Sequence, residues 1–167
     1  MKILKLNLSD GLIRATYIFL ASLFVGIIMG LIFYQEELIY PVQIVFGMRD
    51  FIDIVTRNAI VLILIYVSMV FTKYYAYFVY AINGLVLGVV ISWIIQSDLM
   101  LLLLILPHGV FEMPLLLHTS HHIEKGELYI RENMCQYFKD ISIHLLLVII
   151  CAVIEVYITP RVYNLFI

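Results

Sequence analysis

Two residues in the second half of the chain, His108 and Glu112, have the types and the spacing that catalysis or metal binding needs. They are four positions apart, so on a helix they lie on one face and can touch. An imidazole and a carboxylate placed in this way can share a proton or bind a metal ion. Both lie in an apolar stretch, where burying a charged group costs about 3 kcal/mol in a membrane. The pair therefore marks a candidate functional site.

Pro107, Gly109 and Pro114 surround these two residues and predict an irregular helix. Proline lacks the backbone N–H and its ring clashes with the preceding turn. Glycine further loosens the helix. Irregular backbone survives inside a membrane only against protein or against a water-filled cavity. We therefore expect a kinked helix, with His108 and Glu112 facing the interior of the protein.

Two more polar residues in apolar runs extend this candidate site. Glu155 lies near the end of the last apolar run, and Asn83 lies within the third. At about 1.5 Å per residue, Asn83 falls near the depth of Glu112, and Glu155 falls closer to the outer surface. We expect one polar cluster inside the bundle, formed by His108, Glu112, Glu155 and Asn83.

Three interpretations of this cluster remain open. In the first, it is an interhelical hydrogen-bond cluster of a binding or scaffold protein. In the second, His108, Glu112 and Glu155 hold zinc and are the catalytic residues of an intramembrane peptidase or peptide cyclase. His118 is an alternative third ligand, and whether the chain is an enzyme stays open. In the third, the broken helix binds a hydrophobic peptide in a transport component.

His118, His121 and His122 form a short histidine-rich tract, which is a second candidate for metal binding. The tract falls where the fourth apolar run ends, at the inner face of the membrane. A short histidine tract is only a compositional signal. We expect these side chains to be solvated or close to lipid headgroups.

The composition requires that most of the chain lies in lipid. The 167 residues are 64% hydrophobic and 13% charged, with a mean hydropathy of +1.07. Soluble chains are about 45–50% apolar and about 25% charged, and a chain of this length cannot hide so much apolar surface in a core. The formal net charge of −2 excludes the basic footprint of a nucleic-acid-binding protein.

Five apolar runs predict an all-α, polytopic membrane protein that forms one domain over residues 1–167. Backbone groups in hydrocarbon must bond within helices. The predicted spans are Ala15–Tyr34, Asn58–Thr72, Ala76–Ile95, Leu99–His118 and Ile141–Ile158. Seven lysine and arginine residues fall on one side of these spans and three on the other. The excess of positive charge inside predicts a cytoplasmic N-terminus and an external C-terminus.

The segment before the second span has charged residues at helical spacing. Arg49, Asp53 and Arg57 recur every four positions, with apolar residues on another face. This pattern indicates either an amphipathic helix on the outer membrane surface or an extension of the second span.

The chain resembles the stage II sporulation protein M family over residues 50–160. The resemblance is carried by Leu106-Pro107-His108-Gly109 with Glu112 and Pro114, by Asn83-Gly84 with Gly88, and by Glu155 with Thr159-Pro160. It implies a prokaryotic membrane protein. For the sporulation protein that gives the family its name, the implied role is septal peptidoglycan remodelling beside cell-wall hydrolases. Small relatives are implied in the production of circular bacteriocins, or in immunity to them, often beside ATP-binding cassette genes.

We therefore predict a multi-pass cell-membrane protein that handles a peptide or cell-envelope substrate through the His/Glu cluster, in bacteriocin maturation, export or immunity. The alternatives are a zinc-dependent intramembrane peptidase or peptide cyclase, and a scaffold for cell-wall remodelling partners. The expected surroundings are the lipid bilayer. Candidate partners are a peptide substrate, an ATP-binding cassette ATPase or another membrane protein, and further copies of the chain.

The predicted topology can be tested by cysteine labelling. In a variant without the native thiols, single cysteines at Lys125 and Asn164 should react with an impermeant reagent from opposite sides of the membrane, because the predicted fifth span, Ile141–Ile158, lies between them. Labelling of both positions from outside intact cells would contradict the five-span topology.

Overall fold

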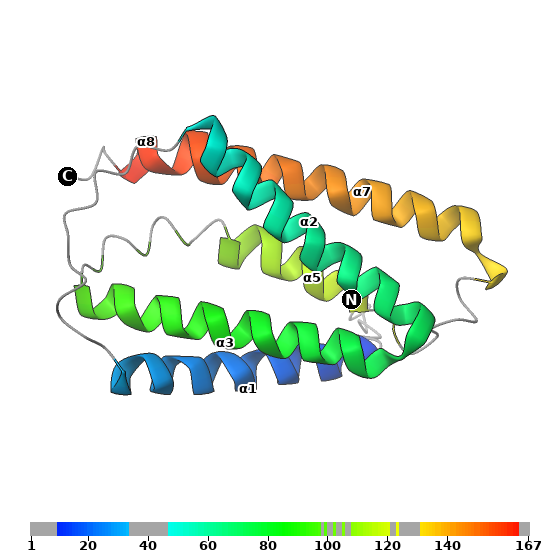
Figure 1. Cartoon of the computed structure of the whole chain (residues 1–167), viewed down its shortest axis with the longest axis horizontal. Helices are drawn as coiled ribbons and strands as arrows, with labels where there is room; N and C mark the ends of the chain where they lie inside the picture. Colours follow the sequence, from blue (N-terminus) through cyan, green and yellow to red (C-terminus); the bar gives the residue numbers. More distant parts are fainter. Residues whose placement is uncertain are drawn as a thin grey trace, which may run out of the picture.

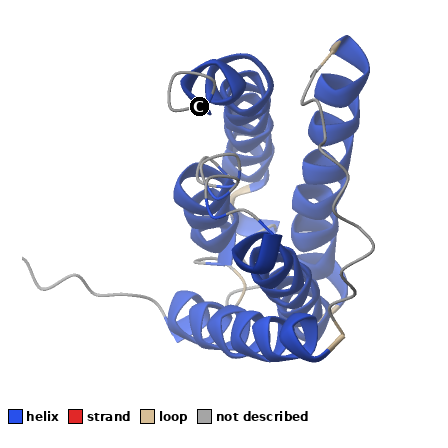
Figure 2. Ribbon diagram, turned by 90° about the vertical axis from the view of Figure 1, so that its left-hand side faces the viewer, coloured by secondary structure: helices blue, strands red, loops and turns tan. Residues whose placement is uncertain are grey.

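The computed structural model describes residues 10–33, 47–97, 99, 102, 105, 108–120, 123 and 131–163, and all the elements in this part of the chain are helical (Figure 2). Two of them, η3 and η5, are π-helical turns. In chain order the elements are α1 (Asp10–Ile32), α2 (Met48–Phe71), α3 (Lys73–Ser97), η3 (His108–Glu112), α5 (Met113–Thr119), α7 (Met134–Val153), η5 (Ile154–Ile158) and α8 (Thr159–Tyr163). The predicted all-α fold is confirmed.

Four helical stretches in the described residues are long and apolar enough to cross a membrane. They are Asp10–Ile32, Met48–Ser68, Lys73–Gln96 and Met134–Tyr163. Large apolar side chains cover their outward faces; Phe24 on α1 is 63% exposed and Leu146 on α7 is 58% exposed. A surface of this kind requires lipid as its solvent. The chain is therefore a multi-pass membrane protein.

The helices run in alternating directions along the long axis of the molecule. Figure 1 shows that α1, α3 and α7 run one way, whereas α2 and α5 run the other way, so that the start of α1 and α8 lie at opposite ends. The predicted fourth span, Leu99–His118, is described only in part, and its second half is η3 followed by α5. An alternating arrangement of this kind agrees with the predicted five-span topology.

The second span begins at Met48, ten residues before the predicted start at Asn58. Arg49, Asp53 and Arg57 therefore lie on the continuous helix α2, and of the two alternatives the extension of the span is confirmed. The apolar run alone placed the boundary too late, because the first turns of α2 carry the charged side chains. The last span also begins early, at Met134 rather than at Ile141.

Each π-helical turn ends two residues before a proline. η3 precedes Pro114, and η5 precedes Pro160. A proline ring clashes with the carbonyl four residues earlier, and a turn with i→i−5 bonding moves that carbonyl aside. Thr159 completes η5, because both its backbone N–H and its hydroxyl (at 3.0 Å) donate to the carbonyl of Ile154. The irregular helix predicted beside His108 is thus present as η3, and a second irregular turn, which was not predicted, carries Glu155.

The short helix α5 lies inside the bundle, among the longer helices (Figure 1). Its Met113 and Leu116 are 4% and 3% exposed, and both belong to the main hydrophobic core. The Tyr80 hydroxyl on α3 donates to the carbonyl of Leu116 at 2.8 Å. The core and this hydrogen bond fix the position of α5 relative to α3.

Glycines allow the backbones of α1 and α3 to approach closely. A Cβ atom at Gly26 on α1 would collide with the Leu85 carbonyl of α3. A Cβ at Gly88 on α3 would collide with the Leu23 carbonyl and would lie 2.8 Å from the Ile27 amide nitrogen of α1. Small residues four positions apart, such as Gly84 with Gly88, are the usual means of close helix packing in membranes. The α1–α3 pair forms one wall of the bundle.

The Gly88→Ala substitution should lower the melting temperature of the protein in detergent. Helix propensity alone predicts the opposite sign, since alanine is about 1 kcal/mol more favourable than glycine in a helix. Overpacking against rigid backbone atoms costs about 1–3 kcal/mol and should outweigh that gain. Gly109→Ala is the matched control, because in the described part of the structure no atom beyond its own turn lies within 4 Å of the Cβ added at this helical glycine. An equal or higher melting temperature for Gly88→Ala would contradict the close approach.

Candidate functional site

Glu112, the last residue of η3, is buried and is held by Asn58 of α2. Its side chain is 1% exposed. The Asn58 Nδ2 atom donates to both carboxylate oxygens, at 2.8 Å to Oε1 and 2.7 Å to Oε2. Hydrogen bonds to a charged group contribute about 1.5–3 kcal/mol, against a large penalty for a buried charge. The contact therefore fixes the carboxylate between α2 and η3.

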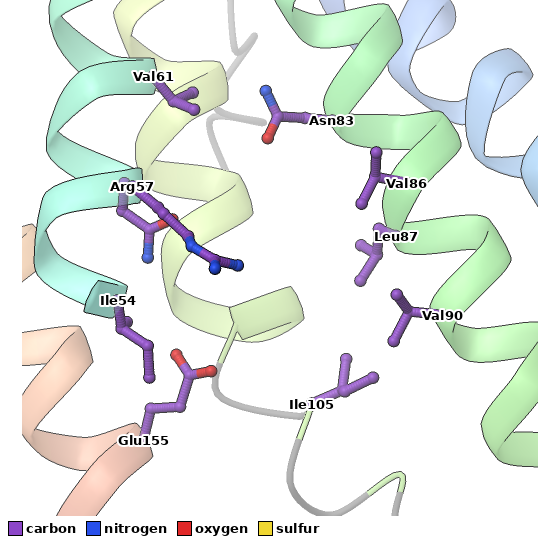
Figure 3. Close-up of a pocket in the computed structure, with 10 residues that line it drawn as sticks. Ile54, Arg57, Val61, Asn83, Val86, Leu87, Val90, Ile105 and Glu155 are labelled. Atoms are coloured by element: carbon purple, nitrogen blue, oxygen red, sulfur yellow. The ribbon is translucent and has the colours of Figure 1, made fainter. Parts of the chain in front are cut away.

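A cavity of about 360 Å³ lies beside this pair (Figure 3). Its volume is within the range of about 300–1,000 Å³ that is usual for small-ligand sites. Three helical elements supply most of its walls. The lining residues are Ile54, Arg57, Asn58 and Val61 from α2, Asn83, Val86, Leu87 and Val90 from α3, Glu155 from η5, and Ile105.

The polar residues of this cavity approach it from different helices. Figure 3 shows the Arg57 side chain extending from α2 into the space between the helices, with Asn83 and Val86 on α3 across from it. Glu155 points toward the same space from η5, and its Oε2 atom is buried. The amide of Asn83 is oriented by a hydrogen bond of 2.8 Å from Nδ2 to the Val79 carbonyl. The cavity thus combines a cation, a carboxylate and amides with apolar walls.

The structure places three of the four predicted cluster residues in or beside this cavity. Asn83 and Glu155 line it, and Glu112 is joined to it through Asn58. Asn58, which bonds Glu112, lines the cavity together with Glu155. The two carboxylates therefore converge, although they come from distant parts of the sequence.

His108 is placed only through its backbone, at the start of η3, and its side chain lies outside the described part of the structure. Among the described side chains, no group of three or more histidine, cysteine, aspartate or glutamate residues is arranged to hold a metal ion. The zinc site of His108, Glu112 and Glu155 stays a prediction. His118, the alternative third ligand, lies at the other end of α5 from Glu112, about 9 Å along the helix axis, and contacts His144 instead.

The structure adds Asn58 and Arg57 to the candidate site, which the sequence motifs do not indicate. The predicted second span begins at Asn58, so that Arg57 falls outside the membrane in that prediction. The four-residue spacing of Arg49, Asp53 and Arg57 was the available signal, because it continues the helical register of the apolar run. A helix that starts at Met48 carries Asn58 about 15 Å along its axis, which brings its amide to the level of Glu112.

A sequence model of the family described as stage II sporulation protein M matches residues 15–160. The chain belongs to this family. The match covers most of α1, all the elements from α2 to η5 and the cavity residues, and it extends further toward the N-terminus than the resemblance found in the sequence motifs. No significant match was found among curated proteins or among solved structures.

A double-mutant cycle tests the contact that anchors the site of this family member. Asn58→Leu and Glu112→Leu should each destabilise the protein in mixed micelles. Together they should destabilise it by about 1–2 kcal/mol less than the sum of the single changes, because each single change leaves one buried polar partner behind. The control cycle pairs Glu112→Leu with Asn83→Leu, since the Asn83 amide bonds a carbonyl of its own helix. Strict additivity in both cycles would contradict the Asn58–Glu112 contact.

Proposed function

We propose that this member of the stage II sporulation protein M family is a membrane component that binds a peptide or cell-envelope substrate in the cavity between α2, α3 and η5. The observation that supports this function most directly is the presence of Arg57, Asn83 and Glu155 around one cavity within a bundle of apolar helices. Ionisable residues inside a membrane generally mark substrate or ion pathways, because structure alone rarely compensates for burying them.

The residues of the cavity indicate the chemistry of the substrate. Arg57 offers a planar guanidinium that binds a carboxylate or phosphate through two parallel hydrogen bonds. Glu155 offers an acceptor for an amine, and Asn83 can pair with an amide. Val86, Leu87 and Val90 form an apolar wall along α3. A substrate with charged or amide groups on an apolar body matches this combination, as a hydrophobic peptide or a lipid-linked envelope precursor does.

The size of the cavity limits how much of the substrate enters. At about 360 Å³ it is at the small end of the range for ligand sites. A chain terminus, a short segment or a headgroup fits, and the rest of the substrate lies along the apolar helices. Such binding serves bacteriocin maturation, export or immunity, or the remodelling of the cell envelope.

The irregular turns support a binding role. π-helical turns occur often at functional sites, and broken helices form substrate sites at the centre of many transporters. Here η3 carries Glu112 and η5 carries Glu155. Both carboxylates of the site are thus attached to turns whose backbone departs from the α-helix.

Site-specific photocrosslinking in cell membranes tests the proposal. A photoreactive amino acid at Val86 should give covalent adducts that contain a peptide or an envelope precursor, identified by mass spectrometry. The Arg57→Gln and Glu155→Gln changes, made in the same background, should reduce those adducts at least several-fold. Phe24, which is 63% exposed on α1, is the control position and should give phospholipid adducts only.

Two results would contradict the proposed function. One is the same set of phospholipid adducts at Val86 and at Phe24. The other is a peptide or precursor adduct whose yield does not change in either Arg57→Gln or Glu155→Gln, because such a molecule would not use the polar residues of the cavity.

A further inference from the structure

A second polar cluster lies at the opposite end of α5 from the cavity and is not used by the proposed function. His118 of α5 and His144 of α7 face one another, with 3.4 Å between His118 Nδ1 and His144 Nε2. Their ring centroids are 5.6 Å apart. His144 is 7% exposed, whereas His118 is exposed. We propose that these two imidazoles form a binding site for a divalent transition-metal ion of the zinc class.

The separation of the two nitrogen atoms fits a shared metal ion better than a direct hydrogen bond. Hydrogen bonds from N–H groups usually span about 2.7–3.2 Å, so 3.4 Å is long. Two imidazole nitrogens bound to zinc at about 2.0–2.1 Å with tetrahedral angles are about 3.3 Å apart. The two nitrogen atoms are therefore spaced as two ligands of one ion.

A backbone contact prepares His144 for this role. Its Nδ1 atom lies 2.7 Å from the Asp140 carbonyl oxygen. A carbonyl oxygen can only accept, so this contact places the proton on Nδ1 and leaves the lone pair on Nε2. The Tyr66 hydroxyl, 2.8 Å from the same Nδ1, can accept a share of that proton. Metal-binding histidines typically donate their second N–H to a carbonyl or similar acceptor in this way.

The surrounding side chains hold the ring of His144 and the backbone next to His118. The Tyr137 hydroxyl donates to the Tyr66 carbonyl at 2.9 Å, and the two tyrosine rings meet edge to face. Near His118, the Tyr80 hydroxyl contacts the Thr119 hydroxyl at 2.8 Å. These tyrosines and Thr119 are buried. Side chains of α2 and α7 thus fix the ring of His144, and Tyr80 of α3 fixes the α5 backbone beside His118, before any ion binds.

The ligand type selects the class of ion. Imidazole nitrogens suit zinc, copper, nickel and iron, whereas magnesium and calcium require oxygen ligands. Two protein ligands leave two positions of a tetrahedral ion for water or for a donor from another molecule. The exposed edge at His118 gives those positions access to solvent.

Metal titration of the purified full-length protein tests the site. After treatment with a chelator, the protein in detergent is titrated with Zn²⁺, and with Co²⁺, whose visible absorption reports tetrahedral coordination. We expect one ion per chain. His144→Ala and His118→Ala should each weaken Zn²⁺ binding at least about tenfold. Replacing a residue that only hydrogen-bonds to a metal ligand already has an effect of this size, and here the ligand itself is removed. His118→Ala changes an exposed side chain, so it keeps the test valid if His144→Ala fails to fold.

Two variants serve as matched controls. Cys135→Ser removes an exposed thiol, and Glu155→Gln removes a carboxylate of the cavity. Both should bind Zn²⁺ as the parent protein does. The proposal is overturned if the chain binds no Zn²⁺, if binding is unchanged in both histidine variants, or if Glu155→Gln alone abolishes it. The last result would place the ion in the cavity.

Discussion

Hydrocarbon offers no hydrogen-bond partners, and this constraint determines how the polar side chains of the bundle are arranged. The segment formed by η3 and α5 shows this most clearly. Asn58 of α2 donates to Glu112, and Tyr80 of α3 donates to a carbonyl near the end of α5. The ring of His144 on α7 faces His118. Three longer helices therefore fix both the depth and the rotation of the short one.

The same arrangement separates the polar groups into two levels. Glu112 and His118 are six residues apart, about 9 Å along the helix axis. The buried side chains of Met113 and Leu116 fill the space between them. Groups at this separation that share no partner usually act independently on stability. Glu112 beside the cavity and the histidine pair thus lie at opposite ends of the η3–α5 segment, and changes at one end should act independently of changes at the other.

The sequence predicts Glu112, Glu155 and Asn83 as candidate residues because a polar side chain in an apolar run is costly to bury, and that cost can be estimated without a structure. Their partners could not be found in the same way. The predicted second span begins at Asn58, ten residues after the observed start of α2, so the prediction places Asn58 at the end of a span rather than within it. The role of His144 has no signal in the sequence, since its contact with His118 depends on the relative rotation of two helices, which is not a local property of either sequence.

Pro114 shows that the sequence can predict an irregular helix without predicting which form the irregularity takes. Pro114 was expected to kink or break its helix, and the structure instead widens the preceding turn into η3. A π-helical turn rotates the residues before it relative to those after it, because it inserts one residue into the helical register. Glu112 lies at the end of such a turn and Glu155 within the other. The direction in which each carboxylate points therefore depends on how the bundle accommodates a proline, which the sequence signals only as a disturbance. In a straight α-helix without the inserted residue, the carboxylate of either segment would be rotated about the helix axis by about 100°, the rotation that one residue contributes.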